Sequence, residues 1–135
     1  MVVEIRLVAD ARVERHSDRA GNDRHRDLSP EQVYELIARL DGEEDVTVVI
    51  RRDGEDGELL VAISGHVAFV GLTAPDGVFQ YVDNDDSGAT AVLQIGGQET
   101  RIDGRYRLAF PKAADVAAAW VRDGRQAACG AWEQR

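Results

Sequence analysis

The sequence has one cysteine, little positive charge and no long apolar run. Cys129 is the single cysteine among 135 residues, so an intramolecular disulfide is impossible and a reducing compartment is expected. No segment approaches the roughly 18 apolar residues that a transmembrane helix requires. The first ten residues also lack the basic region of a signal peptide. We therefore expect a cytoplasmic protein that makes no contact with a membrane.

The shortage of positive charge is unevenly distributed along the chain. There are 25 acidic residues against 16 basic ones, of which only Lys112 is a lysine, and the formal net charge is −9. Binding to nucleic-acid or lipid phosphates needs clustered lysine and arginine, so direct nucleic-acid binding is not expected. The net charge is −1 over residues 1–40, −11 over residues 41–103 and +3 over residues 104–135. The excess of negative charge therefore lies in the middle of the chain.

The residue pattern predicts a single α+β domain over residues 1–135, a mostly antiparallel β-meander with two amphipathic helices in the order β-α-β(five or six)-α-β. Ser29, Pro30 and Gln32 form a capping box at a helix start, and apolar residues at helical spacing follow over residues 33–40. The second helix begins at Pro111 and stops before Gly124. Trp120, on its apolar stripe, is expected to be buried.

The remaining elements are predicted to be strands and turns. Alternating apolar residues predict a strand over residues 2–8. Residues 9–28 carry charges of both signs, which indicates a polar loop, or an extension of the first strand over residues 11–16. Turn-forming residues then separate strands over residues 45–52, 58–64, 67–73, 78–83, 89–95 and 98–103. The tail adds a terminal strand, in which Trp132 is expected to be buried.

The residue types that carry chemistry form no recognisable catalytic, metal or cofactor site. The three histidines share no metal-ligand spacing, and their simplest interpretation is solvated side chains. Residues 83–88 match the first half of a calcium-binding loop, but Gln94 replaces the bidentate glutamate, which favours a polar turn. There is no serine-nucleophile elbow and no glycine-rich nucleotide loop. We therefore expect no enzymatic activity, metal or cofactor.

The acidic turns are the candidate binding surface. Eight of the fourteen acidic residues in the middle segment fall at the two ends of a predicted strand pair, and the other six fall in later turns. Such charge keeps a protein soluble, and it can also steer and select a basic protein partner. The hypothesis places partner contacts at Asp53, Glu55, Asp56, Glu58, Asp83, Asp85 and Asp86.

The C-terminal part of the chain carries a family resemblance over residues 96–133. Its residues are Gly97, Glu99 and Ile102, a helix led by Pro111 with Trp120, then Gly124-Arg125 and Trp132-Glu133. This pattern resembles the first-described family of bacterial polymorphic-toxin immunity proteins, often found beside deaminase-type toxins. Where members of that family tend to have prolines, this chain has Arg101-Ile102-Asp103 and Gln126.

The resemblance implies a non-enzymatic inhibitor of similar size and α+β layout. Such a protein binds a cognate toxin, such as a nucleic-acid deaminase or nuclease, and covers its active site. The resemblance marks Gly97, Glu99, Gly124 and Trp132 as family-signature positions. Two alternatives stay open: a small ligand-binding domain or stand-alone enzyme with a scattered site, and a module that self-associates through a strand edge. The sequence fixes neither the toxin nor the oligomeric state.

Overall fold

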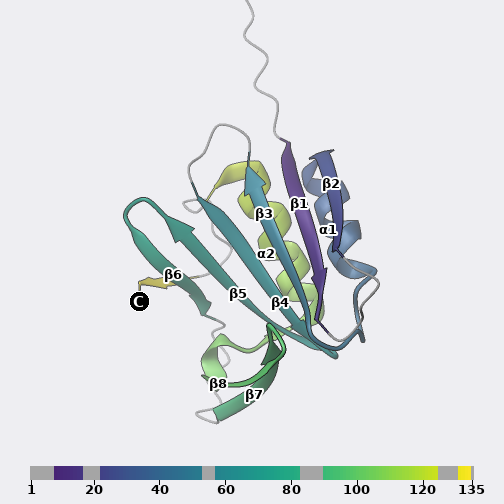
Figure 1. Ribbon diagram of the computed structural model, residues 1–135. Coiled ribbons are helices and arrows are strands. Elements are labelled where there is room, and N and C mark those ends of the chain that lie inside the picture. The colour runs from purple at the N-terminus through teal and green to yellow at the C-terminus, as the bar shows by residue number, and fades with distance from the viewer. Residues whose placement is uncertain (1–7, 17–21, 53–56, 83–89, 125–130, 135) are drawn as a thin grey trace, which may run out of the picture.

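One sheet, with two helices packed on one of its faces, forms the body of the molecule (Figure 1). The structure, a computed structural model, describes residues 8–16, 22–52, 57–82, 90–124 and 131–134. The helices are α1 (Pro30–Ala38) and α2 (Phe110–Asp123), with a short 3-10 helix η1 (Gly104–Tyr106) before α2. The predicted α+β class, with a mostly antiparallel sheet and two helices, is confirmed.

The sheet has the spatial order β10-β6-β5-β4-β3-β1-β2, and every pairing is antiparallel. The short strand β9 pairs with the start of β5, and β7 and β8 form a separate hairpin. The bounds of the strands are β1 (Ala9–Arg15), β2 (Asn22–Leu28), β3 (Val46–Arg52), β4 (Glu58–Ser64), β5 (Val67–Ala74), β6 (Gly77–Val82), β7 (Thr90–Ile95), β8 (Gln98–Asp103), β9 (Leu108–Ala109) and β10 (Ala131–Gln134).

The predicted start of α1 and the predicted extent of α2 are confirmed, whereas α1 ends at Ala38, two residues before the end of the apolar spacing at residue 40. At the start of α1 the Ser29 hydroxyl accepts the Gln32 amide at 3.2 Å, and the Gln32 side chain accepts the Ser29 amide at 2.8 Å. The second helix has Pro111 in its first turn and ends at Gly124, whose φ of 75° suits glycine. Trp120 is 2% exposed, as its place on the apolar stripe predicted.

Of the two interpretations of residues 9–28, the polar loop is wrong for the described residues, and the strand over residues 11–16 is close to the observed one. Ala9–Arg15 is strand β1, paired on one side with β3 and on the other with β2 over Asn22–Leu28. Every second residue of β1, namely Ala9, Ala11 and Val13, is buried beneath the helices. The expected strand over residues 2–8 lies almost wholly outside the described residues, of which residue 8 is the first. The sheet therefore continues past β3, the first strand of the meander, with the two further strands β1 and β2.

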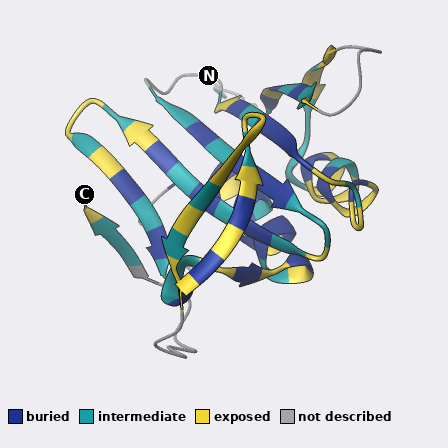
Figure 2. Cartoon of the chain, turned by 60° about the horizontal axis from the view of Figure 1, so that its bottom comes forward, coloured by how far each residue is buried: buried dark blue, intermediate teal, exposed yellow. Residues whose placement is uncertain are grey.

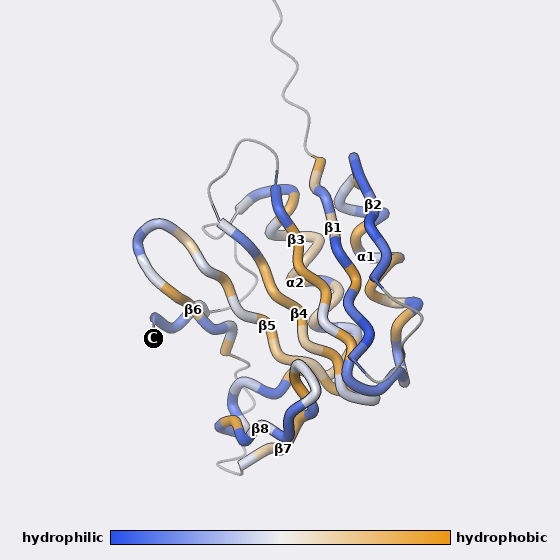
Figure 3. The backbone as a smooth tube through the Cα atoms, in the orientation of Figure 1, coloured by the Kyte–Doolittle hydropathy of each residue, from blue (hydrophilic) through white to orange (hydrophobic). Residues whose placement is uncertain are grey.

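The core lies between the helices and one face of the sheet. Figure 2 shows the alternation of buried and more exposed residues along the strands, and Figure 3 shows hydrophobic central strands, a β1 of mixed hydropathy and a hydrophilic β2. The sheet residues that face the helices are fully or almost fully buried: Ala9, Ala11, Val13, Val46, Val48, Ile50, Leu59, Val61, Ile63, Ala68, Val70, Leu72, Phe79 and Tyr81. Among the helices that the structure describes, none lies on the opposite face of the sheet.

Candidate functional site

The face of the sheet that the helices leave uncovered, called here the open face, is the candidate binding surface. Its centre is a cross-strand row in which Val49 pairs with Leu60 and Leu60 pairs with Gly71. These residues are half-buried, whereas their sequence neighbours Val48 and Val61 are fully buried against the helices. Apolar side chains therefore lie on both faces of the central strands, but only one face is packed.

The β7–β8 hairpin covers one end of the open face (Figure 2). The amide of Gln94 donates to the Ser64 hydroxyl at 3.4 Å, and the amide of Gly97 donates to Asp45 Oδ2 at 2.8 Å. Beneath this end, the cross-strand pair Thr47 and Ala62 is 5% and 1% exposed. The open face is thus closed at the hairpin end and accessible over the rest of its length.

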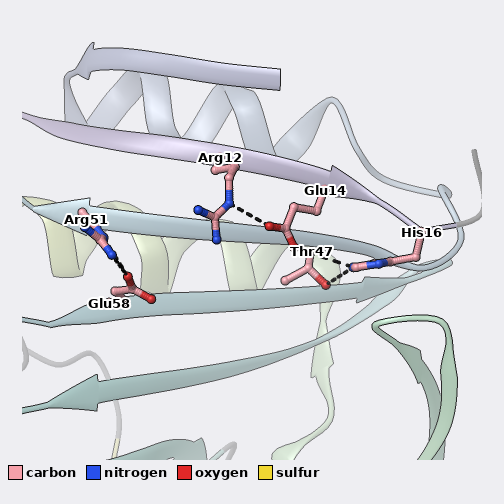
Figure 4. Close-up of polar contacts among 6 residues, drawn as sticks. All are labelled: Arg12, Glu14, His16, Thr47, Arg51 and Glu58. Carbon is pink, nitrogen blue, oxygen red and sulfur yellow. Dashed lines mark hydrogen bonds and ion pairs between the residues drawn. The ribbon is translucent and has the colours of Figure 1, made fainter. Parts of the chain in front are cut away.

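Charged side chains border the open face at β1, β3 and β4 (Figure 4). Arg12 Nε lies 2.7 Å from Glu14 Oε1 on the same strand. Arg51 Nε donates to Glu58 Oε1 at 2.7 Å across the β3–β4 pair. Glu58 is the one predicted partner-binding acid that lies within the described residues. Its carboxylate is engaged by a neighbouring arginine, with 39% of its side chain exposed.

His16, Thr47 and Glu14 meet at the hairpin end of this border, and their arrangement does not suit nucleophilic catalysis. His16 Nε2 lies 3.1 Å from Thr47 Oγ1 and 4.0 Å from Glu14 Oε2. A hydroxyl–imidazole–carboxylate triad needs the hydroxyl and the carboxylate on opposite ring nitrogens, so that one orients the ring while the other loses its proton. Here both oxygens face the same nitrogen, so the cluster can hold the strands together but cannot relay a proton.

A second polar cluster borders the open face at η1 and β10. Glu133 Oε1 accepts the Tyr106 hydroxyl at 2.7 Å and Arg105 Nη2 at 2.7 Å. The Tyr106 ring lies edge-on to Phe69 of β5, with centroids 6.5 Å apart. The hydrogen bond to Glu133, followed by burial, raises the pKa of Tyr106 above its usual value. The neutral phenol therefore anchors the C-terminal strand beside η1.

Six of the seven predicted partner-binding acids fall outside the described residues. Asp53, Glu55 and Asp56 belong to residues 53–56, and Asp83, Asp85 and Asp86 belong to residues 83–89. The described residues next to these two segments lie at opposite ends of the sheet. Residue 58 starts β4 beside the β5–β6 turn, whereas residue 82 ends β6 at the far end of that strand. The calcium-loop comparison at residues 83–88 also lies outside the described residues, as does Cys129.

The four family-signature residues lie in separate parts of the fold. Gly97, with a φ of 81°, forms the β7–β8 turn, and Glu99 is exposed on β8. Gly124 ends α2, its amide donating to the Trp120 carbonyl at 2.8 Å. Trp132 is partly buried, with its ring edge-on to Tyr81 at 5.3 Å between centroids. They do not form one surface, and Gly97, Gly124 and Trp132 have local structural contacts.

The three histidines also lie apart, and only His25 is half-buried, whereas His16 and His66 are exposed. The His66 side chain is 82% exposed, although its Nδ1 lies 2.9 Å from Asp41 Oδ1. His16 contacts Thr47, and His25 of β2 is half-buried beside β1. Among the described residues no group of three or more histidine, cysteine or acidic side chains is placed to hold a metal ion.

A pocket of about 250 Å³ between β2, β1 and β3 is the functional candidate that sequence reasoning missed. The arginines Arg12, Arg24, Arg26 and Arg51 line it, together with Asp10 and His25 among others. The sequence signal for this pocket is the pair Arg24 and Arg26, two residues apart. Such a pair places two arginines on one face only if the segment is a strand, and the sequence does not predict a strand here. A second groove of about 540 Å³ lies between the outer sides of α1 and α2.

Comparisons with known proteins supply no further assignment for the chain. No protein-family model matches the sequence, and a search of the curated proteins finds no match. Within the described residues, no helix is both long enough and apolar enough to cross a membrane.

Proposed function

We propose that this chain is a non-enzymatic immunity protein that binds a cognate bacterial toxin domain and covers its active site. The family resemblance at residues 96–133 supplies the biological role. The structural observation that supports it is the open face of the sheet, where no described helix or strand packs on the row Val49, Leu60 and Gly71.

The composition of the open face suits a protein partner. Specific interfaces combine an apolar centre, from which water is excluded, with a polar and charged rim. Here the apolar row has the Arg51–Glu58 ion pair at one border and the Tyr106–Glu133 cluster at the other. These polar groups are already paired within the chain, so a partner does not have to supply their counter-charges. A rim of this kind lowers the desolvation cost of docking.

The partner we propose has a basic surface, because the middle segment carries a net charge of −11. A basic toxin that contacts both acidic segments must extend along the sheet, since their flanks leave different ends of it. The seven residues of β4 span roughly 20 Å. That length fits an interface of ordinary size, about 800 Å² on each partner.

Co-expression with the products of adjacent genes tests the proposal. We expect the chain to rescue cells from one otherwise lethal neighbour and to purify in complex with it. Leu60→Arg, which places a charge in the centre of the open face, should abolish both rescue and co-purification. Phe69→Ser serves as a second variant of that face.

Val92→Arg is the matched control, because Val92 is an apolar residue on β7 that is 50% exposed and lies outside the apolar row. It should rescue as well as the natural chain. Circular dichroism confirms that each variant is folded. If no neighbouring product is toxic, the proposed role is wrong. If folded Leu60→Arg rescues fully, the proposed face is wrong.

A further inference from the structure

The arginine pocket between β2, β1 and β3 is a concentration of positive charge in a chain whose net charge is −9. Arg12 and Arg24 are directly opposed in the β1–β2 ladder. Like charges at directly opposed positions destabilise a pair of strands. Arg51 is opposed to Asp10 and adds its guanidinium from β3. The fold therefore brings four cationic side chains from three strands to one concave site at an energetic cost.

The acids nearby do not neutralise all of these arginines. Glu14 pairs with Arg12, and Glu58 pairs with Arg51. Asp10 has Oδ1 engaged by the backbone amide of Asp27 at 3.1 Å. Arg24 and Arg26, both exposed, form no ion pair with any residue that the structure describes. As far as the described residues go, these two exposed guanidinium groups keep donors that no carboxylate occupies.

We propose that this pocket binds the phosphate group of a small phosphorylated molecule. A planar carboxylate is satisfied by one bidentate arginine, whereas a tetrahedral phosphate accepts hydrogen bonds from several directions. Arg24 and Arg26 alternate on one strand, so they extend from positions about 7 Å apart and can approach one oxyanion from two sides. Arg12 completes the arrangement from the neighbouring strand.

The size and the electrostatics of the site both favour a small ligand. A volume of about 250 Å³ holds a phosphate with a small organic group, and it falls just below the range usual for larger ligands, roughly 300–1,000 Å³. A long polyanion such as a nucleic acid would meet the net negative field of the chain, and it needs an extended basic stripe rather than one pocket. The pocket shares Val49 and Arg51 with the open face and its border, but phosphate binding is measured on the chain alone, so its outcome does not depend on the toxin-binding role.

Isothermal titration of the purified chain with inorganic phosphate and with methyl phosphate, at constant ionic strength, tests the site. We expect saturable binding of one phosphate per chain. The double variant Arg24→Gln/Arg26→Gln should weaken it at least about tenfold, because each lost charged hydrogen bond contributes one to several kcal/mol. The double variant Arg101→Gln/Arg107→Gln, which removes the same charge from exposed residues outside the pocket lining, should bind like the natural chain.

Amide chemical shifts of the natural chain give a second measurement that needs no variant. On adding phosphate, shifts should concentrate at residues 10–12, 24–26 and 49–51. Absence of saturable binding, equal weakening by both double variants, or shifts spread over the whole surface would each overturn the proposal. Equally tight binding of acetate would overturn the choice of phosphate, and tighter binding of a single-stranded oligonucleotide would overturn the choice of a small molecule.

Discussion

The two faces of the central sheet have similar apolar side chains but opposite surroundings. Leu59 and Val61 point to the helices and are fully buried, while their neighbour Leu60 lies half-buried on the open face. The helix face gains its stability from close packing, which tolerates little change. The open face leaves apolar area partly exposed to solvent, and a partner could bury it. In the function proposed above, folding and partner binding use alternate residues of the same strands.

The largest expected effect separates the two faces by one residue. Leu59→Ala should destabilise the protein by about 3 kcal/mol, because it removes packed atoms and leaves a cavity under the helices. Leu60→Ala should cost about 1 kcal/mol, since much of its side chain already contacts water. Urea denaturation of both variants measures the difference. Equal losses would show that the open face is as tightly packed as the helix face.

The helices and the meander could be predicted because their signals are local. Ser29, Pro30 and Gln32 specify the start of α1 through their own side chains. Glycines with positive φ lie in the described turns β4–β5, β5–β6 and β7–β8. The alternation of Ala9, Ala11 and Val13 also marks β1, but small residues make a weak hydrophobic signal. These elements follow from patterns within a single stretch of sequence.

The rest depended on tertiary structure. Strand β2 has only Leu28 as an apolar residue, so its strand conformation comes from pairing with β1 at the sheet edge rather than from its own pattern. The central strands are apolar on both sides, so only the position of the helices decides which face stays open. For that reason the arginine pocket and the open face could not be predicted, while the acidic turns stay an untested prediction.

The second expected effect is a loss of stability at high pH at the border of the open face formed by Tyr106 and Glu133. The pKa of Tyr106 is raised in the folded protein, by its hydrogen bond to Glu133 and by burial. Below pH 10, about the pKa of an unfolded tyrosine, the stabilisation is fully present, and it is lost as the pH rises through the higher folded pKa. Tyr106→Phe removes that loss. The natural chain should therefore lose more free energy of unfolding than Tyr106→Phe between pH 8 and the alkaline range above 10.

Urea titrations at both pH values measure this difference, and the comparison with Tyr106→Phe cancels the ionisation of the other tyrosines. Glu133→Gln should show a reduced effect, because a neutral amide is a weaker acceptor than a carboxylate. Identical pH dependence in the natural chain and Tyr106→Phe would contradict the structural role of this hydrogen bond.

The smallest expected effect concerns the opposite border. Arg51 and Glu58 form an ion pair whose side chains are 70% and 39% exposed, so water and salt screen it. A double-mutant cycle with Arg51→Ala and Glu58→Ala should give a coupling of about 0.5 kcal/mol or less, falling further as salt is added. A coupling above about 1 kcal/mol that persists in high salt would mean that this border is rigid and desolvated. The small value expected means that the pair adds little to the stability of the fold, so its place at the border matters for docking rather than for folding.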